Sequence, residues 1–253
     1  MHLDHVALAS RDSFAILDVL TGDLGATVLQ GAIQTGFRSV QARMGDAERG
    51  LTVELLEPHR AEEFDFLERF LQARGPGPHH LTFKVPDLAA EIDRVRAAGY
   101  HPTGILLDAP RWKECFLAPV EAHGTVVQLA QDDSNNYPSF AVHFAEARAG
   151  RPYSEPKWWD DPRPRAPGTT VLERVVVSTP TLDDATAFYA DLLQGTIVAE
   201  GAGWRDVTWA GGGCVRLEAD ATRPTGIARL DCTGPGPART ANLAGTSLVI
   251  TPV

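Results

Sequence analysis

Two short stretches of the chain share the same alternation of apolar and other residues. Residues 3–10 and residues 78–85 each carry apolar side chains at every second position. Successive side chains of a strand point to opposite faces of a sheet, so each stretch predicts a strand with one apolar face. Aligned on His5 and His80, the two strands begin two units of the same design.

A stretch with apolar residues at helical spacing follows each of these strands. It covers residues 12–24 in the first unit and 87–98 in the second, where Asp87 suits an N-cap and Gly99 a helix end. Three short strands then follow each helix. They cover residues 27–29, 37–43 and 51–56 in the first unit, and 101–106, 113–117 and 125–130 in the second. Both units therefore predict the order β-α-β-β-β.

The spacing of polar residues supports an internal duplication. The last strand of each unit holds one polar residue within an apolar run, Glu54 in the first and Gln128 in the second. His5 precedes Glu54 by 49 positions, and His80 precedes Gln128 by 48. Such agreement is what a duplicated module produces.

The rest of the chain predicts a linker and an incomplete second copy. A helix over residues 62–73 connects the first two units. Residues 132–168 are rich in proline and predict a linker, with a short helix over 140–149 and packing by Trp158 and Trp159. A third unit begins at Val171. It predicts a helix over 182–193 and strands near 196–199, 205–209 and 214–218.

A fourth unit is reduced to strands over 227–233 and 247–253, without its helix and middle strands. We therefore expect an α+β fold in which paired βαβββ modules form curved, open mixed sheets. Residues 1–131 form the first domain, and residues 169–253 form a degenerate, truncated second one.

Composition narrows the class of protein. The chain has 253 residues and a formal net charge of −10, without a basic cluster, which argues against nucleic acid as a partner. No apolar run approaches the length of a membrane-spanning helix, and the first residues lack the pattern of a signal peptide. The three cysteines are widely spaced and odd in number. We expect a cytoplasmic protein that does not bind membranes.

Four polar residues occupy equivalent positions of the duplicated units. His5 and His80 lie opposite the apolar residues of their strands, as do Glu54 and Gln128. If the two units pair about a pseudo-twofold axis, the four side chains converge. Two imidazoles and two oxygen donors suit a divalent ion such as zinc, nickel, cobalt, manganese or iron. His79 has the opposite strand parity to His80 and is interpreted as a surface or packing residue. The remaining histidines lie outside the repeat register and are interpreted as surface residues: His2, His59, His101, His123 and His143.

Paired β-α-β-β-β units with these positions resemble the vicinal oxygen chelate superfamily, which includes glyoxalase I, extradiol dioxygenases and bleomycin resistance proteins. The resemblance covers residues 1–131 well and 170–253 weakly. Residues 70–88 and 54–58 look most like methylmalonyl-CoA epimerases. The resemblance implies that His80, Glu54 and Gln128 are metal ligands, with His5 as the fourth.

This sequence departs from the epimerase pattern in two ways. The epimerases tend to carry Gln where Glu54 stands and Glu where Gln128 stands, so the ligand types are kept but exchanged. They also resemble one another in a glutamate that acts in proton transfer, and Ser39 occupies that position here. A hydroxyl is a poor base unless a neighbour activates it.

The main hypothesis is a metal-dependent isomerase, epimerase or lyase that stabilises an enolate of a small carbonyl or acyl substrate. Resemblance to glyoxalase I implies that Glu54 also acts as the base. Substrate contacts are expected from Ser39 and from Trp112, Lys113 and Glu114, whose strand borders the cleft. Two alternatives remain open: an Fe(II) extradiol-type dioxygenase, and a binding protein of the resistance type without turnover.

The second half carries arginines at the positions of the metal ligands. Arg174 takes the place of His5 and Arg216 that of Glu54. Two arginines cannot hold a cation but can bind an anion, although a degenerate structural half explains them as well. The second half can cover the first half as a partner subunit would. The substrate cleft is then expected either within one chain or across a homodimer.

Overall fold

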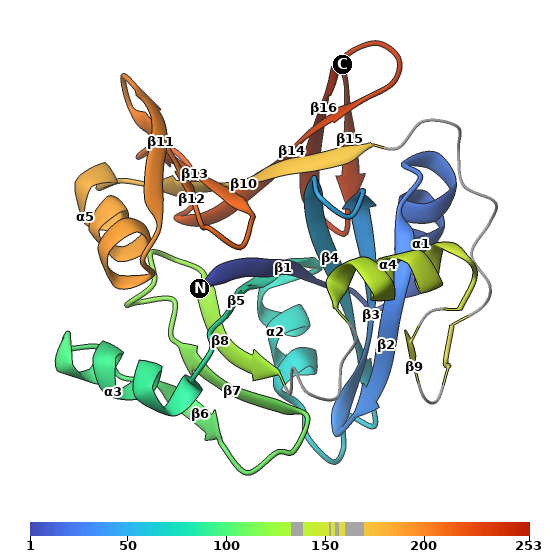
Figure 1. Ribbon diagram of the computed structural model, residues 1–253, viewed down its shortest axis with the longest axis horizontal. Coiled ribbons are helices and arrows are strands. Elements are labelled where there is room, and N and C mark those ends of the chain that lie inside the picture. Colours follow the sequence, from blue (N-terminus) through green and yellow to red (C-terminus); the bar gives the residue numbers. More distant parts are fainter. Residues whose placement is uncertain (133–138, 152, 155–156, 160–169) are drawn as a thin grey trace. The chain divides into compact units, whose positions relative to one another are not determined.

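The computed structural model describes residues 1–132, 139–151, 153–154, 157–159 and 170–253. Most of the predicted linker, with its prolines, lies outside these residues. The described strands form a nine-stranded and a seven-stranded sheet, both with parallel and antiparallel pairs (Figure 1). The α+β class with curved mixed sheets built from paired modules is confirmed. None of the described helices combines the length and the apolar character needed to cross a bilayer.

Contacts between residues divide the chain into two compact units. Unit 1 comprises Met1–His5, His80–Tyr137 and Arg174–Arg229. Unit 2 comprises Val6–His79, Pro138–Glu173 and Leu230–Val253. Each unit contains parts of both predicted domains, and the domain boundaries at residues 131 and 169 stay a prediction.

The second βαβββ module provides the first part of unit 1. Its elements are β5 (Gly77–Lys84), α3 (Leu88–Ala97), β6 (Thr103–Leu106), β7 (Trp112–Leu117) and β8 (Val126–Asp132). The carboxylate of Asp87 accepts a hydrogen bond from the Ala90 N–H, which confirms the predicted N-cap of α3. β5 and β8 run parallel, and Thr82 lies beside Gln128. The register therefore places both side chains on one face.

The first module provides most of unit 2. Its elements are β1 (His2–Ala9), α1 (Ser13–Asp18), η1 (Val19–Asp23), β2 (Thr27–Gln34), β3 (Gly36–Gly45) and β4 (Gly50–His59), followed by α2 (Phe66–Arg74). The helix predicted over residues 12–24 is thus present and ends in a π-helical turn, η1. The antiparallel register of β3 and β4 sets Gln41 opposite Glu54.

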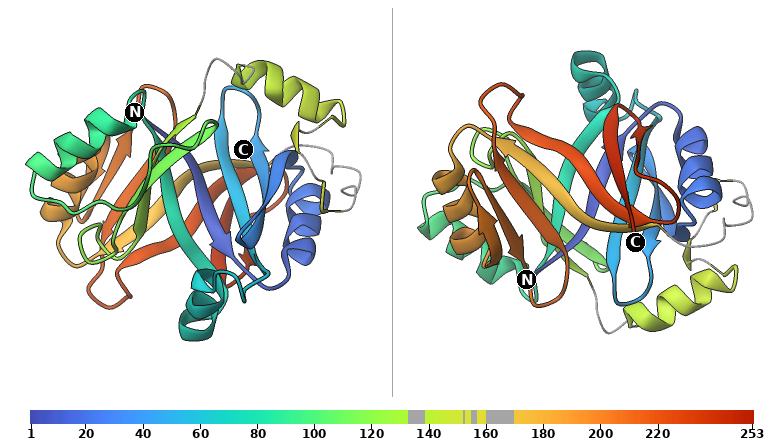
Figure 2. Two further views of the ribbon diagram at one scale, coloured as in Figure 1. Left: turned by 90° about the horizontal axis from the view of Figure 1, so that it is seen from below. Right: turned by 90° about the horizontal axis from the view of Figure 1, so that it is seen from above.

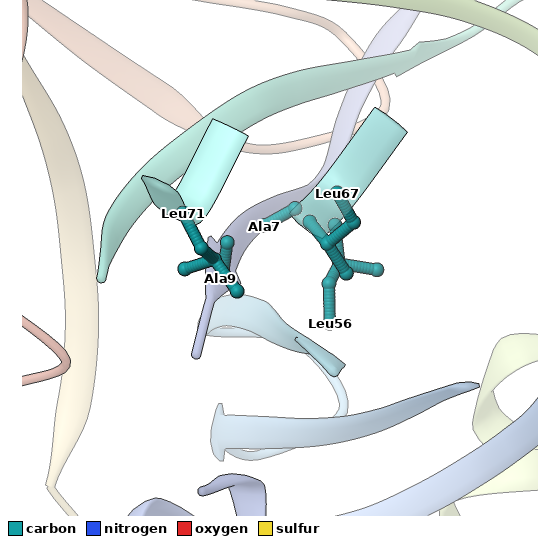
Figure 3. Close-up of a cluster of buried hydrophobic side chains, with 5 residues drawn as sticks. All are labelled: Ala7, Ala9, Leu56, Leu67 and Leu71. Atoms are coloured by element: carbon teal, nitrogen blue, oxygen red, sulfur yellow. The ribbon is translucent and has the colours of Figure 1, made fainter. Parts of the chain in front are cut away.

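Helix α2 covers part of the face of β1 that carries Ala7 and Ala9. Leu67 and Leu71 of this helix pack against Ala7 and Ala9 of β1 and against Leu56 (Figure 3). Ala7 and Ala9 have the same strand parity as His5, so α2 closes that face beyond the histidine. The helix begins four residues later than predicted, because residues 61–63 form a turn.

The third and fourth modules form the seven-stranded sheet. Their elements are β10 (Val171–Thr179), α5 (Leu182–Thr186), η2 (Ala187–Leu192), β11 (Thr196–Gly201), β12 (Trp204–Thr208), β13 (Cys214–Ala219), β14 (Gly226–Gly234), β15 (Arg239–Leu243) and β16 (Thr246–Pro252). β10 and β14 are neighbours in the sheet and run side by side in both views of Figure 2. The prediction that the fourth unit has lost its middle strands was wrong in part. β15 is a middle strand that pairs with β16, and its largely polar sequence hid it.

The segment after β8 contributes a helix and two tryptophans to unit 2. α4 (Phe140–Arg148) agrees with the predicted short helix, and β9 (Tyr153–Ser154) pairs with β2. Trp159 is 4% exposed, and the Trp158 indole N–H donates to the Ser39 carbonyl oxygen over 2.8 Å. The predicted packing of these tryptophans is therefore confirmed.

His123 is half-buried rather than a simple surface residue. Its ring lies 5.6 Å from that of Phe188, and burial lowers its pKa below 6.5 although Asp184 opposes this shift. The folded chain resists protonation of this ring more than the unfolded chain does, so we expect the free energy of unfolding to decrease as the pH falls below 6.5. In His123→Asn this dependence should weaken, and asparagine tolerates the positive φ of 52° at this position.

Urea unfolding of both proteins at about pH 7.5 and about pH 5 measures this effect, because the remaining histidines are common to both. An identical loss of stability in the wild type and in His123→Asn would show that His123 does not contribute.

Candidate metal centre

His5 and His80 bring two imidazoles together in unit 1. They are 1% and 5% exposed, and their ring centroids lie 5.7 Å apart in an edge-to-face arrangement. His5 Nδ1 lies 2.7 Å from Asp4 Oδ2. A carboxylate only accepts hydrogen bonds, so Nδ1 carries the hydrogen and the Nε2 lone pair points away from Asp4. This is the tautomer that a metal ligand needs.

The hydroxyl of Thr82 connects His5 to Gln128. Thr82 Oγ1 lies 2.8 Å from His5 Nε2 and 2.6 Å from Gln128 Oε1. A hydroxyl has one hydrogen, so it can donate to only one of these two atoms at a time. Whichever of His5 Nε2 and Gln128 Oε1 does not accept this hydrogen keeps a lone pair that could bind a cation.

Glu114 holds the other end of the Gln128 amide. Gln128 Nε2 donates to Glu114 Oε2 over 2.7 Å, and the Trp112 indole N–H donates to the same oxygen over 3.0 Å. With its NH2 group bound to Glu114, Gln128 directs its oxygen toward Thr82 and His5. The amide is thereby oriented as an oxygen ligand.

Glu54 is held by a chain of amides in unit 2. Gln41 Nε2 donates to Glu54 Oε1 over 3.2 Å, and Gln30 Nε2 donates to Gln41 Oε1 over 2.8 Å. Both glutamines therefore have a fixed amide orientation, and Gln41 presents a donor to the carboxylate. Such hydrogen bonds position a metal-binding carboxylate.

His5, His80 and Gln128 bring two imidazoles and an amide oxygen together within unit 1. Glu54 of unit 2 is the carboxylate that we expect to complete the set. Two neutral imidazoles, a carboxylate and a nearby amide oxygen are a donor set that fits a divalent transition metal.

A half-buried ion-pair network holds Asp4, the hydrogen-bond partner of His5. Lys84 Nζ lies 3.0 Å from Asp4 Oδ1 and 3.0 Å from Asp132 Oδ2. Burial alone would raise the pKa of Asp4, but Lys84 and hydrogen bonds from His2 and His5 outweigh it and hold that pKa well below its ordinary value. Asp4 is therefore ionised at neutral pH and keeps the His5 Nδ1 hydrogen in place.

Replacing Asp4 with asparagine is expected to weaken metal binding by about 10- to 100-fold, because the His5 ring loses its carboxylate partner. Asp132→Asn is the matched control, since Asp132 pairs with Lys84 but is not the carboxylate that holds His5. Competition with a chromogenic chelator measures both affinities. Equal losses in the two variants would assign the effect to the Lys84 ion pairs instead.

The predicted substrate-binding residues fall into different environments. Trp112 and Glu114 share a face of β7 with Phe116, which lies beside Gln128 in the register, whereas Lys113 has the opposite parity. Ser39 is buried and has the same parity on β3 as Gln41. Trp112 and Glu114 therefore lie near Gln128, and Ser39 lies on the same face as Gln41, the partner of Glu54. Substrate contact by any of the predicted residues stays a prediction.

His79 is a packing residue, as its strand parity predicted. Its ring lies 4.7 Å from that of Phe70 and 6.0 Å from that of Phe66. Burial lowers the pKa of His79 to about 4, although the charge of Glu54 opposes this shift. His79 is therefore neutral at physiological pH.

Three residues of this site were not predicted from the sequence. Asp4, Thr82 and Gln41 contact proposed ligands through their side chains. Thr82 follows His80 by two positions and so shares its face, and Asp4 adjoins His5. Neighbour position and strand parity were the available signals, but which hydrogen bonds form depends on the tertiary structure.

The part of the chain that carries both histidines and Glu54 matches a known family. Residues 4–116 match the model of the glyoxalase/bleomycin resistance protein/dioxygenase superfamily. The match covers less than half of the chain, and it confirms the resemblance noted in the sequence. No curated protein matches the chain.

Solved structures extend the comparison. A hypothetical protein from Staphylococcus aureus superposes with a TM-score of 0.69 at 11% identity, over 99% of each chain, so it shows the same fold throughout. Methylmalonyl-CoA epimerase from Streptomyces coelicolor, in complex with 2-nitronate-propionyl-CoA, is 25% identical, with a TM-score of 0.46 over 55% of this chain and 99% of its own. The epimerase from Mycobacterium tuberculosis is also 25% identical, with a TM-score of 0.46 over 56% and 91%.

Proposed function

We propose that the chain is a divalent-metal-dependent enzyme that removes an acidic C–H proton next to a carbonyl group of a small substrate. Isomerisation, epimerisation and lyase reactions all begin with this step. The observation that carries the proposal is the pair of buried imidazoles in unit 1, where Asp4 holds the Nδ1 hydrogen of His5 and Thr82 connects His5 to Gln128. The match of residues 4–116 to the superfamily model supports it.

His5, His80, Glu54 and Gln128 would hold the ion. When bound, the ion supplies a Lewis acid that stabilises negative charge on a carbonyl oxygen. Glu54 is the one carboxylate of the set, so a dication would keep about one unit of positive charge. The site would then attract an anionic intermediate strongly, at some cost in affinity for the ion.

Glu54 is the proposed base. It is the one carboxylate among the proposed ligands, and Gln41 Nε2 donates to it over 3.2 Å, which fixes its orientation. Glu114 is less suited, because one of its oxygens already accepts from Gln128 and Trp112. Ser39 has no described contact that would activate its hydroxyl. We therefore assign proton removal to Glu54 and orientation of the Gln128 ligand to Glu114.

Hydrogen exchange in D2O tests the proposal without knowledge of the final product. Candidate acyl thioesters and α-hydroxy or α-keto compounds are incubated with the metal-loaded protein, and NMR follows loss of the α-proton. We expect exchange that stops on chelation and returns when the metal is added back. Binding of a compound with no exchange, unaffected by chelation, would instead identify a binding protein.

An Fe(II) dioxygenase is the second candidate, because two histidines and one carboxylate are the ligand set of many non-haem iron oxygenases. Oxygen uptake with a catechol and Fe(II), measured with an electrode, would favour it. Full activity of a zinc- or nickel-loaded protein in the exchange assay would exclude iron chemistry as the main reaction.

A further inference from the structure

Two of the proposed ligands in unit 1 have a carboxylate behind them. His5 donates from Nδ1 to Asp4 over 2.7 Å, and Gln128 donates from Nε2 to Glu114 over 2.7 Å. Asp4 adjoins His5 on the same strand, whereas Glu114 lies on β7, which provides none of the proposed ligands. The contact between Glu114 and Gln128 therefore links β7 to the proposed metal centre.

The register of β7 and β8 sets this contact. Phe116 lies opposite Gln128. Glu114 precedes Phe116 by two positions, so it is the diagonal neighbour of Gln128 on the same face of the sheet. Diagonal neighbours are close enough for two long side chains to meet. Gln128 is 6% exposed, so water has little access to its amide, and Glu114 takes the place that water would have.

The carboxylate of Glu114 selects one of the two orientations of the Gln128 amide. Its oxygens only accept hydrogen bonds, so it faces the NH2 group and not the carbonyl oxygen. The Trp112 indole N–H donates to the same carboxylate oxygen over 3.0 Å and helps to fix its position. At the other end of the amide, the buried Thr82 hydroxyl donates to Gln128 Oε1 over 2.6 Å. The amide therefore presents its oxygen on the side of Thr82.

The same contact restricts which residue type can stand at position 128. A carboxylate there would have no hydrogen to donate, and two carboxylate oxygens would meet at hydrogen-bond distance. Like charges in such close contact repel strongly where burial limits the access of water. With Glu114 on β7, an amide is therefore favoured at position 128. The negative charge of the pair stays on Glu114, behind a neutral ligand.

We propose that Glu114 is a positioning residue of the metal centre. It keeps Gln128 as a neutral oxygen ligand, and its negative charge strengthens the binding of the ion through that amide. A hydrogen bond from the amide NH2 group to a carboxylate polarises the amide and increases the electron density on its oxygen. This role of Glu114 rests on the metal centre of the proposed function, but not on the reaction that takes place there.

Glu114→Gln and Glu121→Gln form a matched pair of variants of the full-length chain. Each removes one negative charge from unit 1, but Glu121 pairs with His101 instead of a proposed ligand. Glutamine at position 114 can still accept from Gln128, so this variant removes the charge and not the side chain. We expect its zinc affinity, measured by competition with a chromogenic chelator, to fall about tenfold or more. The zinc affinity of Glu121→Gln should equal that of the wild type.

Cobalt adds a spectroscopic measurement to this pair. The visible absorption of bound Co(II) depends on its ligands and their geometry. We expect the spectrum to change in Glu114→Gln, because the amide oxygen of Gln128 is held less firmly, and to stay the same in Glu121→Gln. A purely structural role of Glu114 would lower the stability of Glu114→Gln but leave its zinc affinity and its Co(II) spectrum unchanged.

Exchanging the two residue types tests whether positions 114 and 128 are coupled. Gln128→Glu alone places two carboxylates together, so the urea midpoint of the metal-free protein should fall by about 0.5 M or more. In the double variant Glu114→Gln/Gln128→Glu, the hydrogen bond can form again with donor and acceptor exchanged. We expect the stability of the double variant to return toward that of the wild type, and its zinc affinity to equal or exceed that of the wild type.

Three results would overturn the proposal: wild-type zinc affinity in Glu114→Gln, an equal loss of affinity in Glu121→Gln, or a double variant as unstable as Gln128→Glu. A wild-type protein that binds neither zinc nor cobalt would overturn it together with the proposed metal centre. If zinc affinity follows the expected pattern but no compound exchanges its α-proton, the proposed function fails and the role of Glu114 stands.

Discussion

The His80→Ala variant is expected to lose divalent metal almost completely after dialysis, with an affinity at least about 100-fold below that of the wild type. His80 provides one of two imidazoles in a buried site, and it is 5% exposed. Alanine has no ligand atom, and the backbone of β5 cannot supply one because its groups pair with β8. Elemental analysis after dialysis, together with chelator competition, measures content and affinity.

His79→Ala is the matched control for this prediction. His79 adjoins His80 on the same strand but contacts the rings of Phe66 and Phe70. The His79→Ala variant should be less stable because packing is lost, and its metal content should be unchanged. Equal metal content in the wild type and in His80→Ala would rule out the proposed ligand set.

The Glu54→Gln variant is expected to keep the metal but lose α-proton exchange by about 100- to 10,000-fold. Glutamine still offers an oxygen to the ion and can still bond to Gln41, but it cannot accept a proton at neutral pH. The D2O exchange assay measures the rate, and elemental analysis of the same sample measures the metal.

Glu54→Ala separates the two roles of this side chain. It removes both the ligand oxygen and the base, so metal content and exchange should fall together. If Glu54→Gln exchanges protons at the wild-type rate while metal is retained, the base is another residue, and the assignment of proton removal to Glu54 is wrong.

Much of the fold was predictable because each element has a periodic signature. The alternation around His5 and His80 predicted β1 and β5, and helical spacing with Asp87 predicted α3 and its N-cap. β15 was missed because a short, mostly exposed strand has no apolar alternation. Its existence depends on pairing with β16, a contact that local sequence does not encode.

The candidate site was predicted in part for a similar reason. Duplicated spacing identified His5, Glu54, His80 and Gln128, since a repeat exposes equivalent positions whatever the structure around them. The roles of Asp4 and Gln41 were not predictable, because they depend on which side chain lies across the register or behind the ring.

The sequence by itself determined the modules, the residue types at the proposed ligand positions and the arginines at the equivalent positions of the second half, because these depend only on residue identity and spacing. The tertiary structure decided which partners orient those residues. Thr82 connects His5 to Gln128 because β5 and β8 are parallel in one register, and α2 covers Ala7 and Ala9 because its leucines need an apolar surface. Hydrogen bonds and packing depend on distances between segments far apart in the chain, and folding alone sets those distances.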